Sequence, residues 1–134
     1  METTTTTGKQ APRSPLPDEF LAQLASLVKS APPGEGWLHE IKFDGYRIVA
    51  FKDGDSVRLM SRNQKDWTAR FAGVAGAVGG LPVQTAILDG EVVAVRPDGT
   101  TSFQELQNHA RGSGAANVQY QVFDLLYADG TDLR

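Results

Sequence analysis

The sequence contains no cysteine in its 134 residues, which excludes a disulfide framework, a thiolate metal site and a cysteine nucleophile. It also lacks an apolar run long enough to cross a bilayer, and its N-terminus lacks the basic-then-apolar order of a secretory signal. A large excess of positive charge is absent too: the formal net charge is -3, which argues against a general nucleic-acid binder. These absences predict a soluble, cytoplasmic protein without a membrane partner, built as one domain or part of one.

Positive charge is concentrated in one segment. Residues 42–70 carry seven basic and four acidic side chains, which leaves a net charge of +3, whereas the segments before and after are net negative. Clustered lysine and arginine side chains attract phosphate, although many local excesses of charge are only solvated surfaces. If any surface of this protein meets phosphate, we expect it to involve this segment.

The N-terminal 17 residues contain a threonine run and three prolines, with too little apolar content to offset the entropy of ordering. Residues 1–17 are therefore predicted to be a disordered tail. From Asp18 onward apolar residues recur at helical spacing, and Pro32-Pro33-Gly34 is a strong stop signal. An amphipathic helix is predicted from residue 18 to about residue 30.

The rest of the chain alternates strand and helix patterns. Asp53-Gly54 and Asp129-Gly130 indicate tight turns, the first of them inside a β-hairpin. Only four residues follow the second turn, so the last strand is expected to lack a sequence-adjacent partner and the chain to be cut short. Strands are predicted over 37–41, 46–52, 57–60, 86–95 and 118–127, the last one buried, and helices over 66–78 and 103–111. This mixture predicts an α+β fold with a largely antiparallel sheet and flanking helices.

The segment Glu40-Ile41-Lys42-Phe43-Asp44-Gly45-Tyr46-Arg47 carries the most chemical information. In an extended chain Lys42 and Asp44 project from the same face, and Gly45 allows a bend or the close approach of a ligand. A lysine becomes a nucleophile when burial or a nearby cation, here Arg47, favours its neutral form. On these residues alone, an ordinary surface lysine paired with Asp44 remains the more common arrangement.

The same segment matches K-x-D-G-x-R, the signature of the covalent nucleotidyltransferases, which are DNA ligases, RNA ligases and mRNA capping enzymes. Three further segments follow in the family's order: Ser61–Thr68 resembles S-R-N-G-x-D-[WF]-T, Leu88–Val93 resembles the D-G-E segment, and Phe123–Tyr127 resembles the aromatic segment. From about Phe20 to Arg134 the chain resembles the adenylation domain of ATP-dependent DNA ligases, most of all bacterial ligase D. The resemblance implies an ATP-grasp-like nucleotidyltransferase fold.

The resemblance also implies a reaction. Lys42 would attack the α-phosphate of ATP to form lysine-AMP, and AMP would then pass to the 5′-phosphate of nicked or broken double-stranded DNA before the strand is sealed. Mg²⁺ or Mn²⁺ would offset phosphate charge in each step. The implied setting is DNA repair by end joining, with Ku and with polymerase or nuclease domains as partners.

Binding roles follow from the resemblance in the same way. Arg47 and Arg62 would contact the ribose or the phosphates, since a planar guanidinium can donate several hydrogen bonds. Glu91 would bind the ribose hydroxyl and border the assembly of phosphates and metal. Phe123 would stack on the adenine.

Other residues are assigned less specific roles. The backbone of Glu40 and Ile41 would border the adenine. Asp44 would be either a metal contact or a salt-bridge partner. His39 and His109 lack the spacing of a metal pair and are expected to be structural or solvent-facing.

The sequence departs from the family pattern in two respects. Gln64 stands where many members have glycine, so the local turn is expected to differ slightly. The later E-G-[VI]-[VM]-x-K and K-x-K motifs and the C-terminal OB-fold domain have no counterpart before Arg134. Residues 18–134 are therefore expected to form a partial, truncated adenylation domain with much slower adenylation. Two alternatives stay open: an RNA ligase or capping-type guanylyltransferase, and a non-catalytic module that binds nucleotide or DNA ends weakly.

Overall fold

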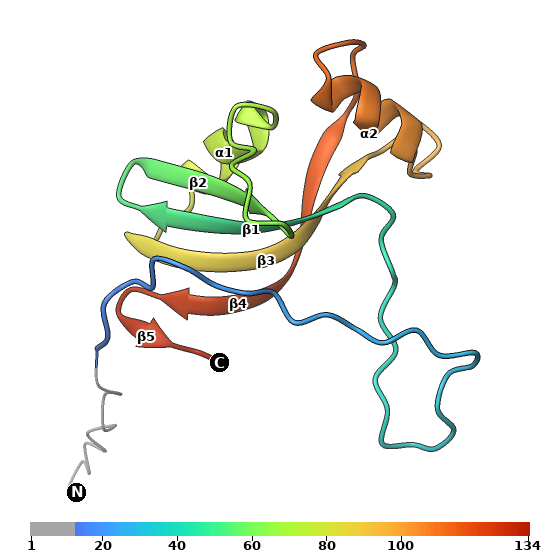
Figure 1. Cartoon of the computed structure of the whole chain (residues 1–134), viewed down its shortest axis with the longest axis horizontal. Helices are drawn as coiled ribbons and strands as arrows, with labels where there is room; N and C mark the ends of the chain where they lie inside the picture. Colours follow the sequence, from blue (N-terminus) through green and yellow to red (C-terminus); the bar gives the residue numbers. More distant parts are fainter. Residues whose placement is uncertain (1–12) are drawn as a thin grey trace, which may run out of the picture.

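The computed structural model describes residues 13–134, and the structural statements below refer to that part of the chain. Its strands form one antiparallel sheet in the order β2-β1-β3-β4-β5 (Figure 1). The predicted α+β class with a largely antiparallel sheet is confirmed. The elements are β1 (Tyr46–Asp53), β2 (Ser56–Ser61), α1 (Ala72–Gly79), β3 (Thr85–Ala94), α2 (Phe103–Ala110), β4 (Val118–Ala128) and β5 (Thr131–Asp132).

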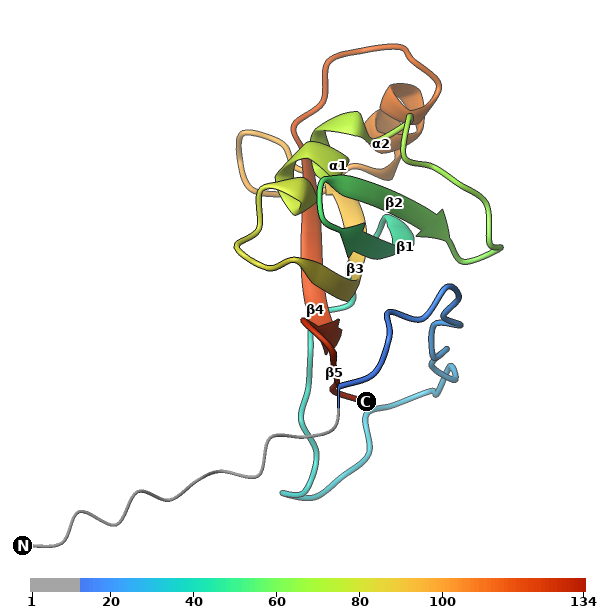
Figure 2. The same ribbon diagram turned by 90° about the vertical axis from the view of Figure 1, so that its left-hand side faces the viewer.

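Both faces of the sheet are covered. Along β1, Ile48 and Ala50 enter one apolar cluster while Val49 and Phe51 enter another, as expected when successive side chains of a strand point to opposite faces. The helices pack on the first cluster, and an N-terminal segment without regular structure packs on the second through Leu16, Phe20 and Ala22. Figures 1 and 2 show both helices on one side of the sheet and the N-terminal segment on the other.

Local signals placed several elements correctly. Gly54 lies in the turn between β1 and β2 with a φ of +57°, which confirms the hairpin predicted at Asp53-Gly54. The predicted strands over 46–52, 57–60 and 86–95 and the helix over 103–111 are confirmed to within about two residues. The helix α2 begins where predicted because the Ser102 side chain accepts a hydrogen bond from the backbone N–H of Glu105 (3.2 Å).

Two predicted N-terminal elements are wrong. Residues 18–30 form no helix, and residues 37–41 form no strand. Phe20 contacts the sheet, but several other apolar side chains of these segments have no surface to pack on: Leu27 is 101% exposed and Leu38 is 94% exposed. Because an isolated helix of this length is marginal in water, the amphipathic pattern of residues 18–30 is insufficient without tertiary packing. Most of the predicted disordered tail, residues 1–12, lies outside the described residues.

The helix predicted over 66–78 starts later than expected, at Ala72. Its first residues form a turn instead, because the carboxylate of Asp66 accepts hydrogen bonds from both the backbone N–H (2.8 Å) and the hydroxyl (2.6 Å) of Thr68. A short polar side chain that binds nearby backbone competes with helix formation in this way.

The last strands also differ from expectation. β4 is present, but its middle is partly exposed, with Phe123 at 43%, so the prediction of a buried strand holds only for part of it. The expectation that β4 lacks a sequence-adjacent partner is wrong, since Asp129 and Gly130 turn the chain into β5 with φ values of +44° and +91°. Within residues 13–134, no helix has both the length and the apolar composition that a membrane span requires.

Candidate active site

One cavity of about 750 Å³ is lined by residues from four parts of the chain, one of which is the N-terminal segment with Leu24 and Ala25. Lys42 and Asp44 come from the segment that leads into β1, Arg47 from β1, Arg62 from the loop after β2, and Glu91 from β3. These five were all predicted site residues, although they span 49 positions of sequence between the first and the last. The sheet order brings them together because β1 lies between β2 and β3.

Three predicted site residues do not line this cavity: Glu40, Ile41 and Phe123. Ile41 is 79% exposed. Phe123 is nevertheless adjacent to the site, since the Arg47 guanidinium carbon lies 4.8 Å from the centroid of its ring. A guanidinium at this distance from an aromatic face makes a favourable cation–π contact.

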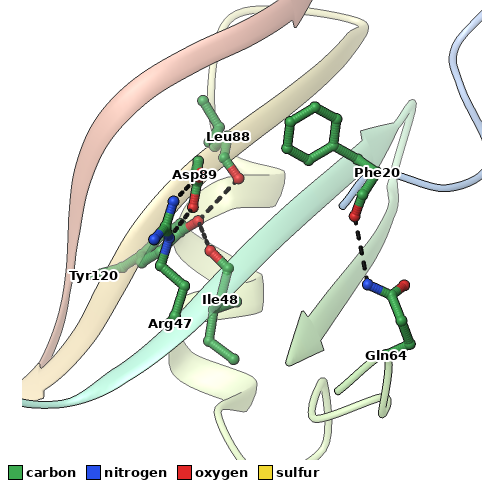
Figure 3. Close-up of polar contacts among 7 residues, drawn as sticks. All are labelled: Phe20, Arg47, Ile48, Gln64, Leu88, Asp89 and Tyr120. Carbon is green, nitrogen blue, oxygen red and sulfur yellow. Dashed lines mark hydrogen bonds and ion pairs between the residues drawn. The ribbon is translucent and has the colours of Figure 1, made fainter. Parts of the chain in front are cut away.

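Arg47 is held by Asp89, the aspartate of the D-G-E segment. Its Nε and Nη2 each donate a hydrogen bond of 2.6 Å to Asp89, one to each carboxylate oxygen (Figure 3). The Asp89 side chain is only 5% exposed, and its hydrogen bond to Arg47 raises the pKa of the guanidinium above the ordinary value, against the opposing effect of burial. A bidentate pair of this kind fixes the guanidinium plane as well as its charge.

Glu91 has different partners, although it lies two residues from Asp89. The backbone N–H of Gly45 donates a hydrogen bond to Glu91 Oε1 (3.2 Å). Burial raises the pKa of Glu91, while the Gly45 N–H and the charges of Arg47 and Lys42 act in the opposite direction. In the sheet register Arg47 is directly opposite Glu91, yet it pairs diagonally with Asp89. Glu91 therefore faces the cavity without a hydrogen bond from Arg47.

The glycine of the first motif is required by a close contact. A Cβ atom at Gly45 would lie 1.9 Å from the carbonyl oxygen of Val92, the residue after Glu91 on β3. Only glycine lets the chain pass this carbonyl and bring its own N–H to Glu91. The glycine thus connects the lysine-bearing segment to the carboxylate-bearing strand.

A β-bulge determines where Phe123 points. Asp89 pairs with Asp124 and Gly90 pairs with Val122, so Phe123 has no partner of its own on β3. Bulges locally bend and twist a strand and can reorient a side chain next to an active site. Here the bulge leaves the Phe123 ring beside Arg47.

The loop after β2 keeps a glycine-like conformation without a glycine. Gln64 has a φ of +59°, in the left-handed region that glycine favours. The loop is closed by hydrogen bonds from Ser61 N to Lys65 O (2.8 Å) and from Lys65 N to Ser61 Oγ (3.1 Å). Ser61, Arg62 and Lys65 all line the cavity.

Three aromatic residues of the cavity wall, Phe43, Tyr46 and Trp67, were not predicted as site residues. Tyr46 and Trp67 both line it, with ring centroids 4.7 Å apart in an edge-to-face arrangement. Each lies inside a motif segment, so proximity to the motif residues was the signal that could have identified them. The histidines lie elsewhere: His39 is exposed, and His109 stacks on Phe71.

A divalent cation would find few donors beyond two carboxylates. Asp44 and Glu91 both line the cavity, and Asp44 forms no ion pair with another residue of the described chain. No cluster of three or more potential ligands occurs in residues 13–134. Magnesium commonly binds through one or two carboxylates plus substrate phosphates, so this donor set fits a cation that arrives with a nucleotide.

Comparison with known proteins finds similar sequences among DNA ligases and end joining proteins. The multifunctional non-homologous end joining protein LigD of Pseudomonas aeruginosa is 42% identical over 127 residues, which cover 95% of this chain and 15% of that protein. A probable DNA ligase of Mycolicibacterium vanbaalenii is 38% identical over 123 residues, which cover 85% of this chain and 23% of that protein.

Two solved structures are similar to this chain. They are the ligase domain of LigD from M. tuberculosis, with a TM-score of 0.61 and 36% identity, and mycobacterial DNA ligase D complexed with ATP and MES, with a TM-score of 0.62 and 37% identity. Each match covers 70% of this chain and 30% of the solved chain. This chain thus spans less than a third of each of these four relatives. Because the ATP-dependent DNA ligase domain family matches residues 19–134, the chain belongs to that family.

Proposed function

We propose that the cavity binds ATP and that Lys42 becomes covalently adenylated. The Lys42 Nζ would attack the α-phosphorus, a nitrogen–phosphorus bond would form, and the bond to the bridging oxygen would break to release pyrophosphate. The amine proton would pass to solvent. The observation that carries the proposal is the convergence of Lys42, Arg47 and Glu91 on one cavity from separate segments of the chain.

The charges around the cavity suit a nucleotide triphosphate. Arg62 and Lys65 lie in the loop after β2 and line the cavity, where they would offset negative charge on the phosphates. Glu91 would accept a hydrogen bond from a ribose hydroxyl, and Phe123 would stack on the adenine next to Arg47. Backbone groups of Glu40 and Ile41 would border the base.

Mg²⁺ or Mn²⁺ would be held by Asp44 and Glu91 together with phosphate oxygens, and it would supply neutralisation of phosphate charge. The proposed roles of the other cavity residues do not depend on the cation. Arg47 and Arg62 orient the nucleotide, and the Gly45 N–H keeps Glu91 in place.

The later steps of the proposal involve DNA. AMP would pass from Lys42 to the 5′-phosphate of nicked or broken double-stranded DNA, and a 3′-hydroxyl would displace it to seal the strand. The names of the LigD relatives support a place in end joining. We further propose that the protein acts in the cytoplasm at the nucleoid, with Ku and with polymerase or nuclease domains as partners.

Intact-mass spectrometry after incubation with ATP and Mg²⁺ or Mn²⁺ tests the covalent step. We expect a mass increase of one adenylyl group in the wild-type chain and in Lys29→Ala, and none in Lys42→Ala. Lys29 is an exposed lysine outside the cavity, so it is the matched control. An adduct that survives Lys42→Ala would contradict the assignment of Lys42.

The same assay separates the alternatives. Adenylation with ATP and none with GTP favours a DNA ligase over a capping-type guanylyltransferase. A wild-type chain that gains no adduct would contradict the proposed catalysis and favour a non-catalytic nucleotide- or DNA-binding module.

A further inference from the structure

Tyr120 on β4 reaches across a neighbouring strand. Its hydroxyl lies 2.8 Å from the carbonyl oxygen of Ile48 on β1 and 3.1 Å from the carbonyl oxygen of Leu88 on β3 (Figure 3). A tyrosine hydroxyl has one proton to donate, so the two carbonyl groups share it. Burial raises the pKa of Tyr120, and the hydroxyl therefore stays a donor at neutral pH.

The two carbonyl groups adjoin the Arg47–Asp89 ion pair. Ile48 follows Arg47 along β1, and Leu88 precedes Asp89 along β3. Ile48 and Leu88 belong to the apolar cluster on the helix side, whereas adjacent residues of a strand project to the other face. The Tyr120 hydroxyl thus contacts the backbone next to both members of the ion pair, from the helix side of the sheet.

Glycine in the D-G-E segment makes room for this contact. A Cβ atom at Gly90 would lie 2.6 Å from Cε2 of the Tyr120 ring and 2.5 Å from the carbonyl oxygen of Gln121. Only a residue without a side chain lets the ring pass beneath β3. The β3–β4 register also shifts between Asp89 and Gly90, so regular pairing with β4 is interrupted beside the ion pair.

The geometry points to Tyr120 as a positioning residue of the nucleotide site. Its hydroxyl contacts backbone carbonyl groups of both β1 and β3 beside the β-bulge, and so fixes the positions of Arg47 and Asp89 relative to Glu91. This inference rests on the proposed function. Tyr120 does not line the cavity and acts through the two strands. Small displacements of orienting groups can lower a reaction rate by orders of magnitude.

Tyr127 provides a matched control on the same strand. It is a buried tyrosine whose hydroxyl also donates to a backbone carbonyl, that of Ser14 (2.5 Å), but it lies outside the cavity. In the full chain, Tyr120→Phe and Tyr127→Phe each delete one buried hydroxyl. We expect both to lower the melting temperature, and only Tyr120→Phe to slow lysine-AMP formation at saturating ATP, by about tenfold or more.

The Arg47 Nε–H resonance in NMR spectra gives a second readout that needs no catalysis. Because this proton is bound to Asp89, we expect its exchange with water to become faster in Tyr120→Phe and to be unchanged in Tyr127→Phe. Equal behaviour of the two variants in both assays would overturn the inference. If the wild-type chain forms no lysine-AMP, the proposed function fails, and the Arg47 resonance still decides whether Tyr120 positions the ion pair.

A milder change covers the case in which Tyr120→Phe does not fold. With 3-fluorotyrosine at position 120 or 127, fluorine NMR reports on each ring in a folded chain. ATP should shift the resonance at position 120, because the ring contacts Gly90 between Asp89 and Glu91, and should leave position 127 unchanged. An unchanged resonance at position 120 in a chain that forms lysine-AMP would overturn the inference.

Discussion

Asp89 and Glu91 lie two residues apart on β3, yet their carboxylates do different work. Asp89 accepts hydrogen bonds from two guanidinium nitrogens of Arg47, whereas Glu91 accepts one from a backbone N–H, that of Gly45. A half-buried carboxylate with few hydrogen bonds carries a desolvation cost, and this is why burial raises the pKa of Glu91. Such an uncompensated group suits a ligand that brings its own donor, as a ribose hydroxyl would.

The raised pKa of Glu91 predicts a specific pH dependence of stability. The ordinary value is 4.5, and the folded state holds the proton more tightly than the unfolded state. Ionisation of Glu91 therefore lowers the free energy of unfolding as pH rises from the ordinary pKa through the raised one. We expect Glu91→Gln to be stabilising relative to wild type at about pH 8 and less so at about pH 4, measured by urea denaturation.

An exposed glutamate serves as the control for this experiment. Glu35→Gln tests whether removal of any carboxylate has the same effect. If Glu91→Gln changes stability by the same amount at both pH values, burial of the Glu91 carboxylate does not have the energetic cost argued here.

At the scale of elements, glycine residues decide how closely the strands and the motif segment approach. The chain before β1 passes the Val92 carbonyl at Gly45, and the Tyr120 ring passes beneath β3 at Gly90. The glycine of helix α1 at position 73 has no such role, since a Cβ atom there would have no neighbour within 4 Å. Gly45 and Gly90 are thus required by close contacts, whereas Gly73 only lowers the stability of its helix.

Alanine substitutions separate these contributions. Gly45→Ala forces a methyl group against Val92 and should cost about 1–3 kcal/mol or more of unfolding free energy, while moving the Gly45 N–H away from Glu91. Gly73→Ala should instead stabilise the chain by about 0.5–1 kcal/mol, because alanine loses less entropy in a helix. Denaturation in urea measures both, and a harmless Gly45→Ala would disprove the close contact.

At the scale of the whole molecule, the sheet and its two helices contain most of the buried apolar residues, and much of the segment before β1 is exposed. The core on the helix side includes fully buried residues such as Leu106 of α2, whereas Leu27 is fully exposed. The N-terminal segment meets the sheet mainly through its first residues, where Phe20 packs on the other face. Stability should therefore be distributed unevenly along the chain.

A pair of leucine substitutions measures this distribution. Leu106→Ala removes a buried side chain and should cost about 2–5 kcal/mol, whereas Leu27→Ala should change the unfolding free energy by less than about 0.5 kcal/mol. Thermal or urea denaturation of both variants provides the test. A large loss in Leu27→Ala would mean that residues 18–30 pack in solution as the helix their periodicity predicts.

The sequence by itself determined those features of the structure that depend on residues close together in the chain. The Asp53-Gly54 hairpin, helix α2 behind Ser102 and the K-x-D-G-x-R segment around Lys42 all follow from short-range patterns, because turn geometry and capping involve residues a few positions apart. The family membership, which the match over residues 19–134 shows, was predicted from such short motifs.

Tertiary structure alone decided the partners across the sheet. The Arg47–Asp89 ion pair joins residues 42 positions apart, and the Tyr120–Ile48 hydrogen bond joins residues 72 positions apart. Both require the strand order, and the Tyr120 hydrogen bond also lies beside the register shift between β3 and β4. Strand order and register arise from packing between strands and leave no periodic trace in the chain. For the same reason the apolar periodicity of residues 18–30 could not determine a helix, since a helix of that length needs a surface to pack on.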